Sequence, residues 1–421
     1  MKKRVLILNC GTLASTDINM SLRYNDEFEI WGASTNKNHG IYVYENYIED
    51  IPNISDEKFI EILNSKIEEY DFKFIFAPHE DLALFLQEHK NEIKATIVCS
   101  EYETALLCRY KSKTYEKMKE YDFIPKILKK EEVTEFPVFM KKDTDQGGRN
   151  AYKVTNKEEL EIYSMIDGML ICEYLPGEEI TIDCFTNKDG KLLYCNPRAA
   201  DRMLAGIDVH ARRIELTDEI KYIAESLNKE IKFRGFWFFQ IKKAANGKFK
   251  LLEIATRLAG AFALNKSLDV NLPLAALKDF DGQDVEIIFN DVNVEVDKQF
   301  FSKFIMDIEY STVYIDFESC FENIKIINTL LMMYIYQCIN KNKEIILVTN
   351  NEEKIDLLLE EKKLNKNIFS KIINFEKFKD VVNAEEIFIS NNENLKNELR
   401  KSKNIYCFST NSVEALIDWK A

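Results

Sequence analysis

Lys141 and the glycines that follow it are the first residues whose types and spacing suit nucleotide chemistry. Met140-Lys141-Lys142 ends a predicted strand, and the chain continues through Gln146, Gly147 and Gly148. Glycine lets backbone N–H groups approach phosphate oxygens, and a strand lysine supplies the countercharge. Taken alone, the pattern more often belongs to a surface hairpin with solvated lysines, so its weight depends on the stretches that follow.

A second stretch, Cys172–Glu179, runs from one strand through Pro176 and Gly177 into another strand. Backbone groups at such a hinge can read an adenine edge. A carboxylate just beyond it, here Glu179, can accept hydrogen bonds from a ribose.

A third stretch pairs Phe239–Ile241 with Leu252–Arg257 across a turn at Asn246 and Gly247. If these strands are neighbours, Gln240 and Glu253 face one side together and present oxygen ligands to Mg²⁺. Arg257 would lie nearby for a phosphoryl or carboxyl group. The alternative for Glu253 is a strand glutamate that an arginine neutralises.

The elements that must position these residues differ along the chain. Up to about residue 105, short apolar runs alternate with amphipathic segments, which predicts a parallel sheet covered by helices. The strands expected there are Val5–Asn9, Phe28–Ala33, Phe74–Ala77 and Ala95–Cys99, with helices around 56–69 and 82–92. Gly11 follows the first strand, but the GxGxxG fingerprint is missing, so we do not expect NAD.

Two further regions follow a helix expected over residues 106–125. The first is mostly antiparallel, with strands expected at Val138–Lys142, Ala151–Val154, Met169–Glu173, Glu179–Thr186, Lys191–Asn196, Phe236–Lys242 and Lys248–Ile254. From about residue 310, strands at Thr312–Phe317, Glu344–Thr349, Ile372–Phe375, Glu386–Ser390 and Ile405–Phe408 predict a separate small α/β domain.

Composition excludes several classes of protein. The 421 residues carry 57 basic and 71 acidic side chains, a net charge of −14, with no dense basic run, which argues against nucleic acid as a partner. No apolar stretch reaches the ~20 residues of a membrane span, and the N-terminus reads as a strand instead of a signal peptide. Nine cysteines without a CxxC pair favour reduced thiols in a cytoplasmic protein over a zinc site.

The order of these stretches resembles the ATP-grasp superfamily, especially the branch near carbamoyl phosphate synthetase and biotin carboxylase. The resemblance covers residues 1 to about 300. It implies a Rossmann-like pre-ATP-grasp domain at 1–105 and an ATP-grasp domain at 106–305 with its lid at about 125–175. The strand pattern after it predicts a doubly wound α/β domain at 306–421. The whole is then a multidomain α/β and α+β protein.

The resemblance also implies ATP and Mg²⁺ as cofactors and assigns roles to residues. Nucleotide binding falls to the following residues: Lys111, Lys141, Gln146, Gly147, Gly148, Glu173, Tyr174, Leu175, Glu179, His210 and Gln240. Gln240 and Glu253 hold the metal. Arg198, Arg202 and Arg257 act on the substrate side, where Arg forks match carboxylate and phosphate. For Arg198 and Arg202 the alternative is a solvated basic loop, and a lone His such as His210 is usually structural or solvated.

One departure weakens the metal site. Similar proteins usually read Glu-Ile-Asn-Pro-Arg where this chain has Glu253-Ile254-Ala255-Thr256-Arg257. Ala255 cannot ligate a metal, but phosphate oxygens and water already hold Mg²⁺ on ATP, so the second metal site should suffer most.

The last domain resembles the haloacid dehalogenase (HAD) superfamily at its first two motifs. Asp316 stands where that family has its nucleophile, Glu318 where it has a second Asp, and Thr349 where it has a phosphate ligand, with Lys371 a candidate third-motif lysine. Ser390, Asn391 and Asn392 replace the metal-binding aspartates of the fourth motif. A longer acid at 318 and the lost carboxylates predict a degenerate domain without phosphatase activity, with a structural, dimerising or docking role.

The sequence therefore predicts an ATP-dependent, ADP-forming ligase that joins a carboxylate to an amine or another nucleophile through an acyl phosphate. Its partners would be small-molecule substrates, without nucleic acid or membrane, and a homodimer is left open. Two alternatives remain. One is an HAD-type phosphatase with a regulatory nucleotide-binding unit, and the other is a non-enzymatic nucleotide-binding scaffold, which Ala255 favours.

Overall fold

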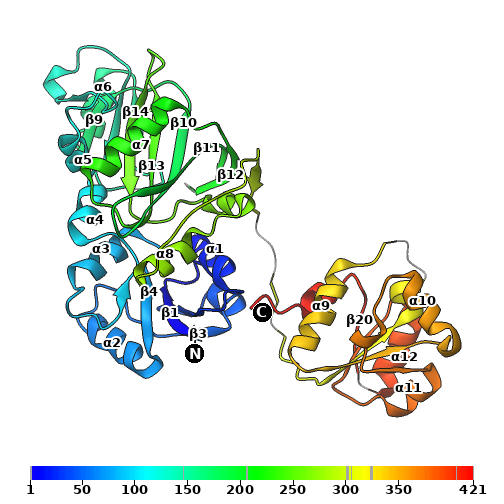
Figure 1. Ribbon diagram of the computed structural model, residues 1–421. Helices are drawn as coiled ribbons and strands as arrows, with labels where there is room; N and C mark the ends of the chain where they lie inside the picture. Colours follow the sequence, from blue (N-terminus) through cyan, green and yellow to red (C-terminus); the bar gives the residue numbers. More distant parts are fainter. Residues whose placement is uncertain are drawn as a thin grey trace. The chain divides into compact units, whose positions relative to one another are not determined.

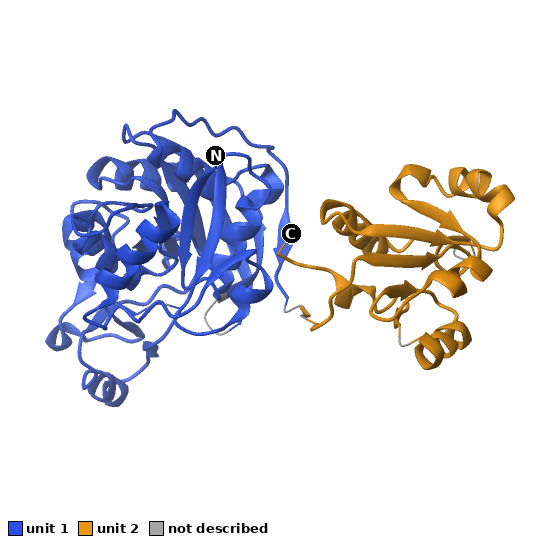
Figure 2. Cartoon of the chain, turned by 90° about the horizontal axis from the view of Figure 1, so that it is seen from below, with its two compact units in different colours: residues 1–300 blue, residues 301–421 orange. Residues whose placement is uncertain are grey.

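The structure is a computed structural model that describes residues 2–145, 147–204, 207–299, 303–304, 306–322, 326–403 and 405–420. The chain forms two compact units, residues 1–300 and 301–421 (Figure 2). Each unit has its own buried core, so each is described by itself.

The first unit begins with a five-stranded parallel sheet in the order β3-β2-β1-β4-β5 (Figure 1). All four predicted strands of this region are present, and the short β3 adds an edge strand that the sequence did not indicate. The bounds are β1 Lys3–Leu8, β2 Phe28–Ala33, β3 Asn46–Ile48, β4 Phe72–Phe76 and β5 Thr96–Ile97, with helices α1 Leu13–Leu22, α2 Phe59–Tyr70 and α3 Glu80–Glu88 and the 3₁₀ turn η1 His39–Tyr42.

The helix predicted over residues 106–125 is wrong in extent. Two short helices, α4 Tyr102–Arg109 and α5 Lys111–Lys117, replace it. Tyr110 between them has extended backbone angles (φ −108°, ψ 113°), and the N–H of Lys111 donates to the carbonyl of Asp143 at 3.3 Å. This break directs Lys111 and Tyr115 of α5 toward the sheets that follow.

A four-stranded antiparallel sheet comes next, in the order β6-β9-β7-β8. Its bounds are β6 Ile127–Leu128, β7 Val138–Lys142, β8 Ala151–Val154 and β9 Met169–Glu173, with η2 Lys130–Glu132 and helix α6 Lys157–Tyr163. β7, β8 and β9 match the predicted strands residue for residue. Short apolar runs bounded by turns carried enough information here, and one face of the sheet packs on a small core of its own.

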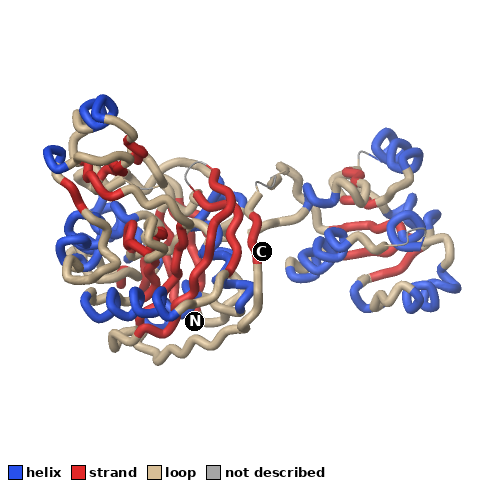
Figure 3. The backbone as a smooth tube through the Cα atoms, turned by 90° about the horizontal axis from the view of Figure 1, so that it is seen from above, coloured by secondary structure: helices blue, strands red, loops and turns tan. Residues whose placement is uncertain are grey.

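The largest sheet has six strands in the order β14-β13-β10-β11-β12-β15, and all its pairs are antiparallel. Figure 3 shows the strands of the chain in red. The bounds are β10 Glu179–Thr186, β11 Leu192–Leu204, β12 Ile207–Arg213, β13 Gly235–Lys243, β14 Phe249–Ala255 and β15 Glu295–Asp297, with α7 Asp218–Glu230, η3 Phe262–Leu268 and α8 Leu272–Phe280. One face packs on α7 through Ile182, Trp237 and Leu227. The opposite face of this sheet packs on α8 and on the five-stranded parallel sheet, and the three elements share one core.

The second unit is a five-stranded parallel sheet in the order β18-β17-β16-β19-β20. Its strands are β16 Thr312–Asp316, β17 Glu344–Val348, β18 Lys371–Ile373, β19 Ile387–Ile389 and β20 Tyr406–Phe408. α9 Thr329–Asn340 and α10 Ile355–Glu361 cover one face, while α11 Phe375–Val381 and α12 Glu393–Lys403 cover the other. The short turns are η4 Glu318–Glu322, η5 Glu352–Lys354, η6 Lys366–Ile368 and η7 Val413–Leu416.

Within the described part of the chain, every helix is too short or too polar to cross a bilayer.

Candidate active site

A row of polar side chains crosses the six-stranded sheet. Glu253 on β14 pairs with Gln240 on β13, Gln240 pairs with Thr181 on β10, and Thr181 pairs with Arg198 on β11. Directly paired residues of antiparallel strands point to the same face. The Gln240 amide donates to the Thr181 hydroxyl at 3.1 Å. The sheet face opposite α7 therefore offers hydroxyl, amide and carboxylate oxygens side by side.

Two lysines converge on the Glu253 end of this row. Lys111 Nζ lies 3.3 Å from Glu253 Oε2 and donates to the carbonyl of Asp145 at 2.8 Å. Lys141 Nζ, on the smaller sheet, donates to the carbonyl of Leu252 at 2.9 Å. Each lysine is only 7% exposed. The cluster of Lys111, Lys141, Gln240 and Glu253 thus stands between the two antiparallel sheets.

Lys141 is held in a place that disfavours its own charge. Burial lowers the pKa of Lys141, and the neighbouring charge of Lys111 lowers it as well, while Glu253 opposes the shift. Burying an ammonium costs stability, and proteins keep such a group where it binds a ligand of opposite charge. An anion delivered between the two lysines would supply that charge.

Arg257 follows β14 and meets the first sheet of the unit. Its Nε lies 3.1 Å from Glu80 Oε1, and its guanidinium lies over the ring of Phe238, 5.0 Å from the centroid. Burial raises the pKa of Glu80, and Arg257 opposes that shift. Arg109 Nη1 approaches the other Glu80 oxygen at 3.9 Å. Glu80 stands just beyond the carboxyl end of β4, where open α/β sheets place ligands.

Neither Glu80 nor Arg109 was singled out from the sequence. Position just after the β4 strand was the one signal that could have found Glu80. Arg109 carries no local signal, because its role depends on the packing of α4 against α3.

Arg198 lies in strand β11 and not in a solvated basic loop, so that alternative is wrong. The side chain is fully buried, with Nε 3.1 Å from Asp183 Oδ2 and Nη1 3.0 Å from Asp208 Oδ2. Asn265 also donates to Asp183 at 2.9 Å. Arg198 thus bridges two carboxylates inside the sheet, about three strand spacings (~14 Å) from the Glu253 backbone.

Arg202 and His210 occupy a separate group on β11, β12 and β15. Arg202 is 60% exposed at its side chain and pairs with Asp297. His210 Nδ1 lies 3.3 Å from Asp201 Oδ2, and its Nε2 lies 3.8 Å from Glu295 Oε2. The structure does not bring these two residues to the lysine cluster.

The glycine-rich stretch forms the loop between β7 and β8. Gly147 and Gly148 both have positive φ, 63° and 72°. A Cβ on Gly148 would meet nothing within 4 Å, so this turn needs glycine for its backbone angles and not for lack of space. Gln146 lies outside the described residues.

The hinge begins with Glu173, the last residue of β9, and continues through Tyr174 and Leu175. Glu173 Oε1 accepts from the backbone N–H of Lys126 at 2.8 Å, and the Glu173 N–H donates to the Lys126 carbonyl at 2.9 Å. Leu175 is buried, and Lys153 Nζ lies 4.5 Å from the ring centroid of Tyr174. Glu179 is exposed and pairs with Lys242 at 3.3 Å. The Glu173 carboxylate therefore orders the hinge backbone.

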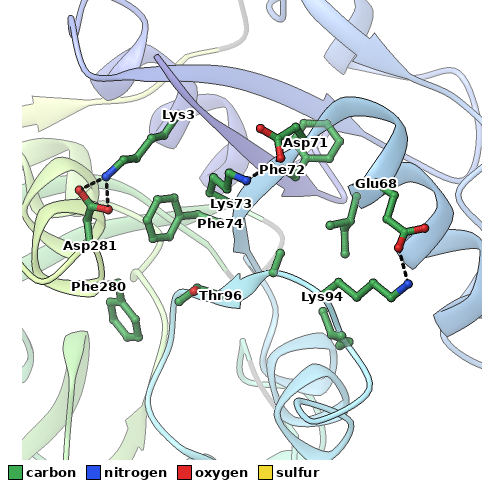
Figure 4. A pocket seen from close by; sticks show the side chains of 13 residues that line it. Lys3, Glu68, Asp71, Phe72, Lys73, Phe74, Lys94, Thr96, Phe280 and Asp281 are labelled. Carbon is green, nitrogen blue, oxygen red and sulfur yellow. Dashed lines mark hydrogen bonds and ion pairs between the residues drawn. The ribbon is translucent and has the colours of Figure 1, made fainter. Parts of the chain in front are cut away.

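A hollow of about 690 Å³ opens elsewhere on the first unit (Figure 4). It lies at the amino ends of β1, β4 and β5, and three ion pairs line it, namely Lys3 with Asp281, Lys73 with Asp71 and Lys94 with Glu68. Glu80 and Arg257 meet at the opposite, carboxyl end of β4. We therefore do not place the nucleotide in this hollow.

Comparison with known proteins identifies the architecture. Solved structures with the same arrangement include the biotin carboxylase domain of 2-oxoglutarate carboxylase from Hydrogenobacter thermophilus, in complex with MgADP, ADP and bicarbonate. It is 16% identical with a TM-score of 0.57, over 68% of this chain and 71% of that one. The first unit has the ATP-grasp fold. The predicted ATP-grasp fold is thereby confirmed.

Further comparisons agree with this fold. N5-carboxyaminoimidazole synthetase from Staphylococcus aureus, complexed with ADP, is 16% identical with a TM-score of 0.57, over 68% of this chain and 79% of that one. The L-amino acid ligase from Bacillus licheniformis is 13% identical with a TM-score of 0.52, over 66% and 74%. Residues 165–300 match a family model described as ATP-grasp in the biosynthetic pathway with Ter operon. No curated protein sequence matches the chain significantly.

The second unit gathers polar groups at the carboxyl ends of β16, β17 and β19. Asp316 Oδ2 accepts from the Ser390 hydroxyl at 2.6 Å, and Asp316 Oδ1 accepts from the Ser319 N–H at 3.2 Å. Burial raises the pKa of Asp316, and the hydrogen bond from Ser390 opposes that shift. Lys371 begins β18 and pairs with Glu344, the first residue of β17, at 2.7 Å, so the pair lies at the amino ends of these parallel strands and Asp316 at the carboxyl end of β16. That placement does not support a role for Lys371 beside Asp316.

Glu318 already accepts hydrogen bonds from the groups that would donate to a bound phosphate. Its Oε1 accepts from the Thr349 hydroxyl at 2.6 Å and from the Asn350 N–H at 2.8 Å. A carboxylate already bound to this hydroxyl and amide leaves them unavailable to a phosphoryl group unless Glu318 moves.

Proposed function

We propose that the chain is an ATP-dependent ligase that joins a carboxylate to an amine or another nucleophile, with ADP and phosphate as products. The cluster of Lys111, Lys141, Gln240 and Glu253 between the two sheets carries this proposal. The solved structures of the same fold support it, because those proteins are named as carboxylases, synthetases and ligases and several hold ADP.

The lysines take the nucleotide phosphates. Lys111 and Lys141 put two buried positive charges on one side of the cluster, where they would neutralise the charge of a triphosphate. The hinge at Glu173, Tyr174 and Leu175 would present backbone groups to the adenine. Glu179 would accept hydrogen bonds from the ribose hydroxyls in place of its ion pair with Lys242.

Gln240 and Glu253 fit magnesium as oxygen donors that share one side of the sheet. No group of three His, Cys, Asp or Glu that could hold a metal occurs among the described residues, so the remaining ligands would be phosphate oxygens and water. Magnesium bound with ATP supplies positive charge to the transferring phosphoryl group. Ala255, two residues further along β14, is buried and adds no ligand.

Arg257 is the substrate-side cation. It follows the β14 strand that carries Glu253, and it pairs with Glu80 beyond the carboxyl end of β4, where an incoming carboxylate would reach it. The carboxylate oxygen attacks the terminal phosphorus of ATP, ADP leaves, and the nucleophile then attacks the acyl carbon and expels phosphate. Arg198 is buried between Asp183 and Asp208, so we assign it to holding the sheet together, and Arg202 and His210 remain candidates for a rim contact.

For the second unit we propose an HAD-like fold without phosphatase activity. Asp316 at the end of the central strand supports the resemblance, and the capture of Thr349 by Glu318 argues against turnover. The nine unpaired cysteines favour a reducing, cytoplasmic setting.

The test is Mg-ATP binding by calorimetry, followed by phosphate release across a panel of acids and amines. We expect binding in the micromolar range and phosphate release that depends on an acid. Binding without release for any acid would favour the scaffold alternative. Hydrolysis of a generic phosphate ester that Asp316→Asn abolishes would favour the phosphatase alternative.

A further inference from the structure

The hydroxyl of Tyr115 joins the two sheets at the lysine cluster. It donates to the carbonyl of Leu252 on β14 at 2.6 Å and accepts from Lys141 Nζ on β7 at 2.7 Å. Tyr115 is 1% exposed, and its ring centroid lies 5.3 Å from the same Nζ. One side chain of α5 therefore contacts a main-chain atom of one sheet and the ammonium of the other.

Leu252 is a special position in β14. Gln240 pairs with Glu253, but the next residue, Ile241, pairs with Leu251, so Leu252 is the extra residue of a bulge. A bulge leaves its residue outside the regular ladder and turns the side chains beside it. The Leu252 carbonyl is satisfied by Tyr115 and by Lys141, and the adjoining side chain is that of Glu253.

We propose that Tyr115 is a positioning residue that holds the Lys141 ammonium and the bulge before Glu253 in one fixed arrangement. The inference rests on the proposed function, in which Lys141 binds phosphate and Glu253 binds metal. With its hydroxyl and carbonyl contacts made, Lys141 has one N–H left, since an ammonium has three donors. Tyr115 and Leu252 thereby direct that last donor.

The hydroxyl, and not the ring, makes these contacts. Burial raises the pKa of Tyr115, so the hydroxyl keeps its proton and remains a donor to Leu252 at physiological pH. Tyr115→Phe keeps the ring in the core and removes both hydrogen bonds. Lys141 then still donates to Leu252, but its ammonium loses one of two acceptors and can turn about that carbonyl.

The experiment measures the Kd for Mg-ATP by calorimetry in the wild type, Tyr115→Phe, Lys141→Met and the double variant. We expect Tyr115→Phe to raise the Kd between about 5-fold and 30-fold, less than the loss of the ammonium itself, because the hydroxyl acts on the nucleotide only through Lys141. In the Lys141→Met background the same change should alter the Kd less than about 2-fold, because the group being positioned is absent.

Tyr121→Phe is the matched control. Tyr121 follows α5 in the chain and donates to Glu230 at 2.9 Å, away from Lys141. The Kd of the Tyr121→Phe variant for Mg-ATP should equal that of the wild type. The basic limb of the turnover–pH profile should move to lower pH in Tyr115→Phe alone, because an acceptor that favoured the charged ammonium is gone.

The possible outcomes distinguish failure of the proposed function from failure of the inference about Tyr115. No wild-type binding would overturn the proposed function and the inference together. Wild-type binding with an unchanged Kd in Tyr115→Phe, or equal losses in the presence and absence of Lys141, would overturn the inference alone. A Tyr115→Phe chain that does not fold would assign the hydroxyl to stability and overturn it as well.

Discussion

Replacement of Lys141 by methionine should move stability and nucleotide affinity in opposite directions. Methionine has a similar length and no charge, so the variant loses the cost of burying an ammonium. It leaves no polar group unsatisfied, because Tyr115 still donates to Leu252. Replacing buried charge by an apolar side chain of similar volume is commonly neutral or stabilising by about 1 to 4 kcal/mol. At about 3 °C per kcal/mol for a unit of this size, we expect the melting temperature to rise by up to ~12 °C.

The same variant should bind Mg-ATP more weakly. Loss of one charge-assisted hydrogen bond costs about 1.5 to 3 kcal/mol, which corresponds to a Kd roughly 10-fold to 150-fold higher. Scanning calorimetry of the free protein and titration calorimetry with Mg-ATP measure the two effects. Lys142→Met, the next residue of β7, is the control, and neither quantity should change in it.

The stability gain has a defined pH dependence. The folded-state pKa of Lys141 lies below its ordinary value of 10.5, so the folded chain binds fewer protons than the unfolded chain between those two values. Wild-type stability therefore rises with pH across that window, and the advantage of Lys141→Met should shrink toward pH 10. A lower melting temperature in Lys141→Met, or an unchanged Kd, would refute the reasoning from its burial and contacts.

Three further outcomes are expected. Glu253→Ala should abolish acid-dependent phosphate release while the chain stays folded by circular dichroism; full turnover would remove Glu253 from the metal site. Arg257→Lys should keep the Kd for Mg-ATP and raise the KM for the acid at least tenfold, as loss of a bidentate fork does, and an unchanged KM would contradict the substrate-side role. Asp316→Asn should leave ligase turnover unchanged, and a large loss measured by phosphate release would show that the chemistry is misplaced.

Much of the first unit could be predicted because its local patterns are strong. β7, β8, β9 and β10 match the predicted strands residue for residue, since each is a short run rich in apolar residues between clear turns. The hairpin through the Asn246-Gly247 turn was predicted, but the register of that turn alone places Gln240 opposite Leu252. The bulge at Leu252 brings Glu253 opposite Gln240, and no sequence signal indicated that bulge. The sequence lacked any comparable marker for β12 and β15, which pair across a long separation.

What the sequence could not supply was contact between distant elements. Tyr115 looked like any aromatic residue of a short helix, and its role depends on a carbonyl 137 positions further along the chain. Arg198 looked exposed in a charged stretch, yet its side chain is buried, because Asp183 and Asp208 neutralise its charge. Side chains that act through tertiary contacts leave no periodic trace.

Strand β15 decides where the first unit can be cut from the chain. Its three residues, Glu295–Asp297, seal the outer side of β12, and Lys298 just after them pairs with Asp17 and donates to the carbonyl of Gly260 at 2.7 Å. A fragment ending before Glu295 would expose a row of unpaired N–H and C=O groups, the feature through which sheets aggregate. Fragments that run past Lys298 should stay dispersed, and those that stop a few residues earlier should precipitate.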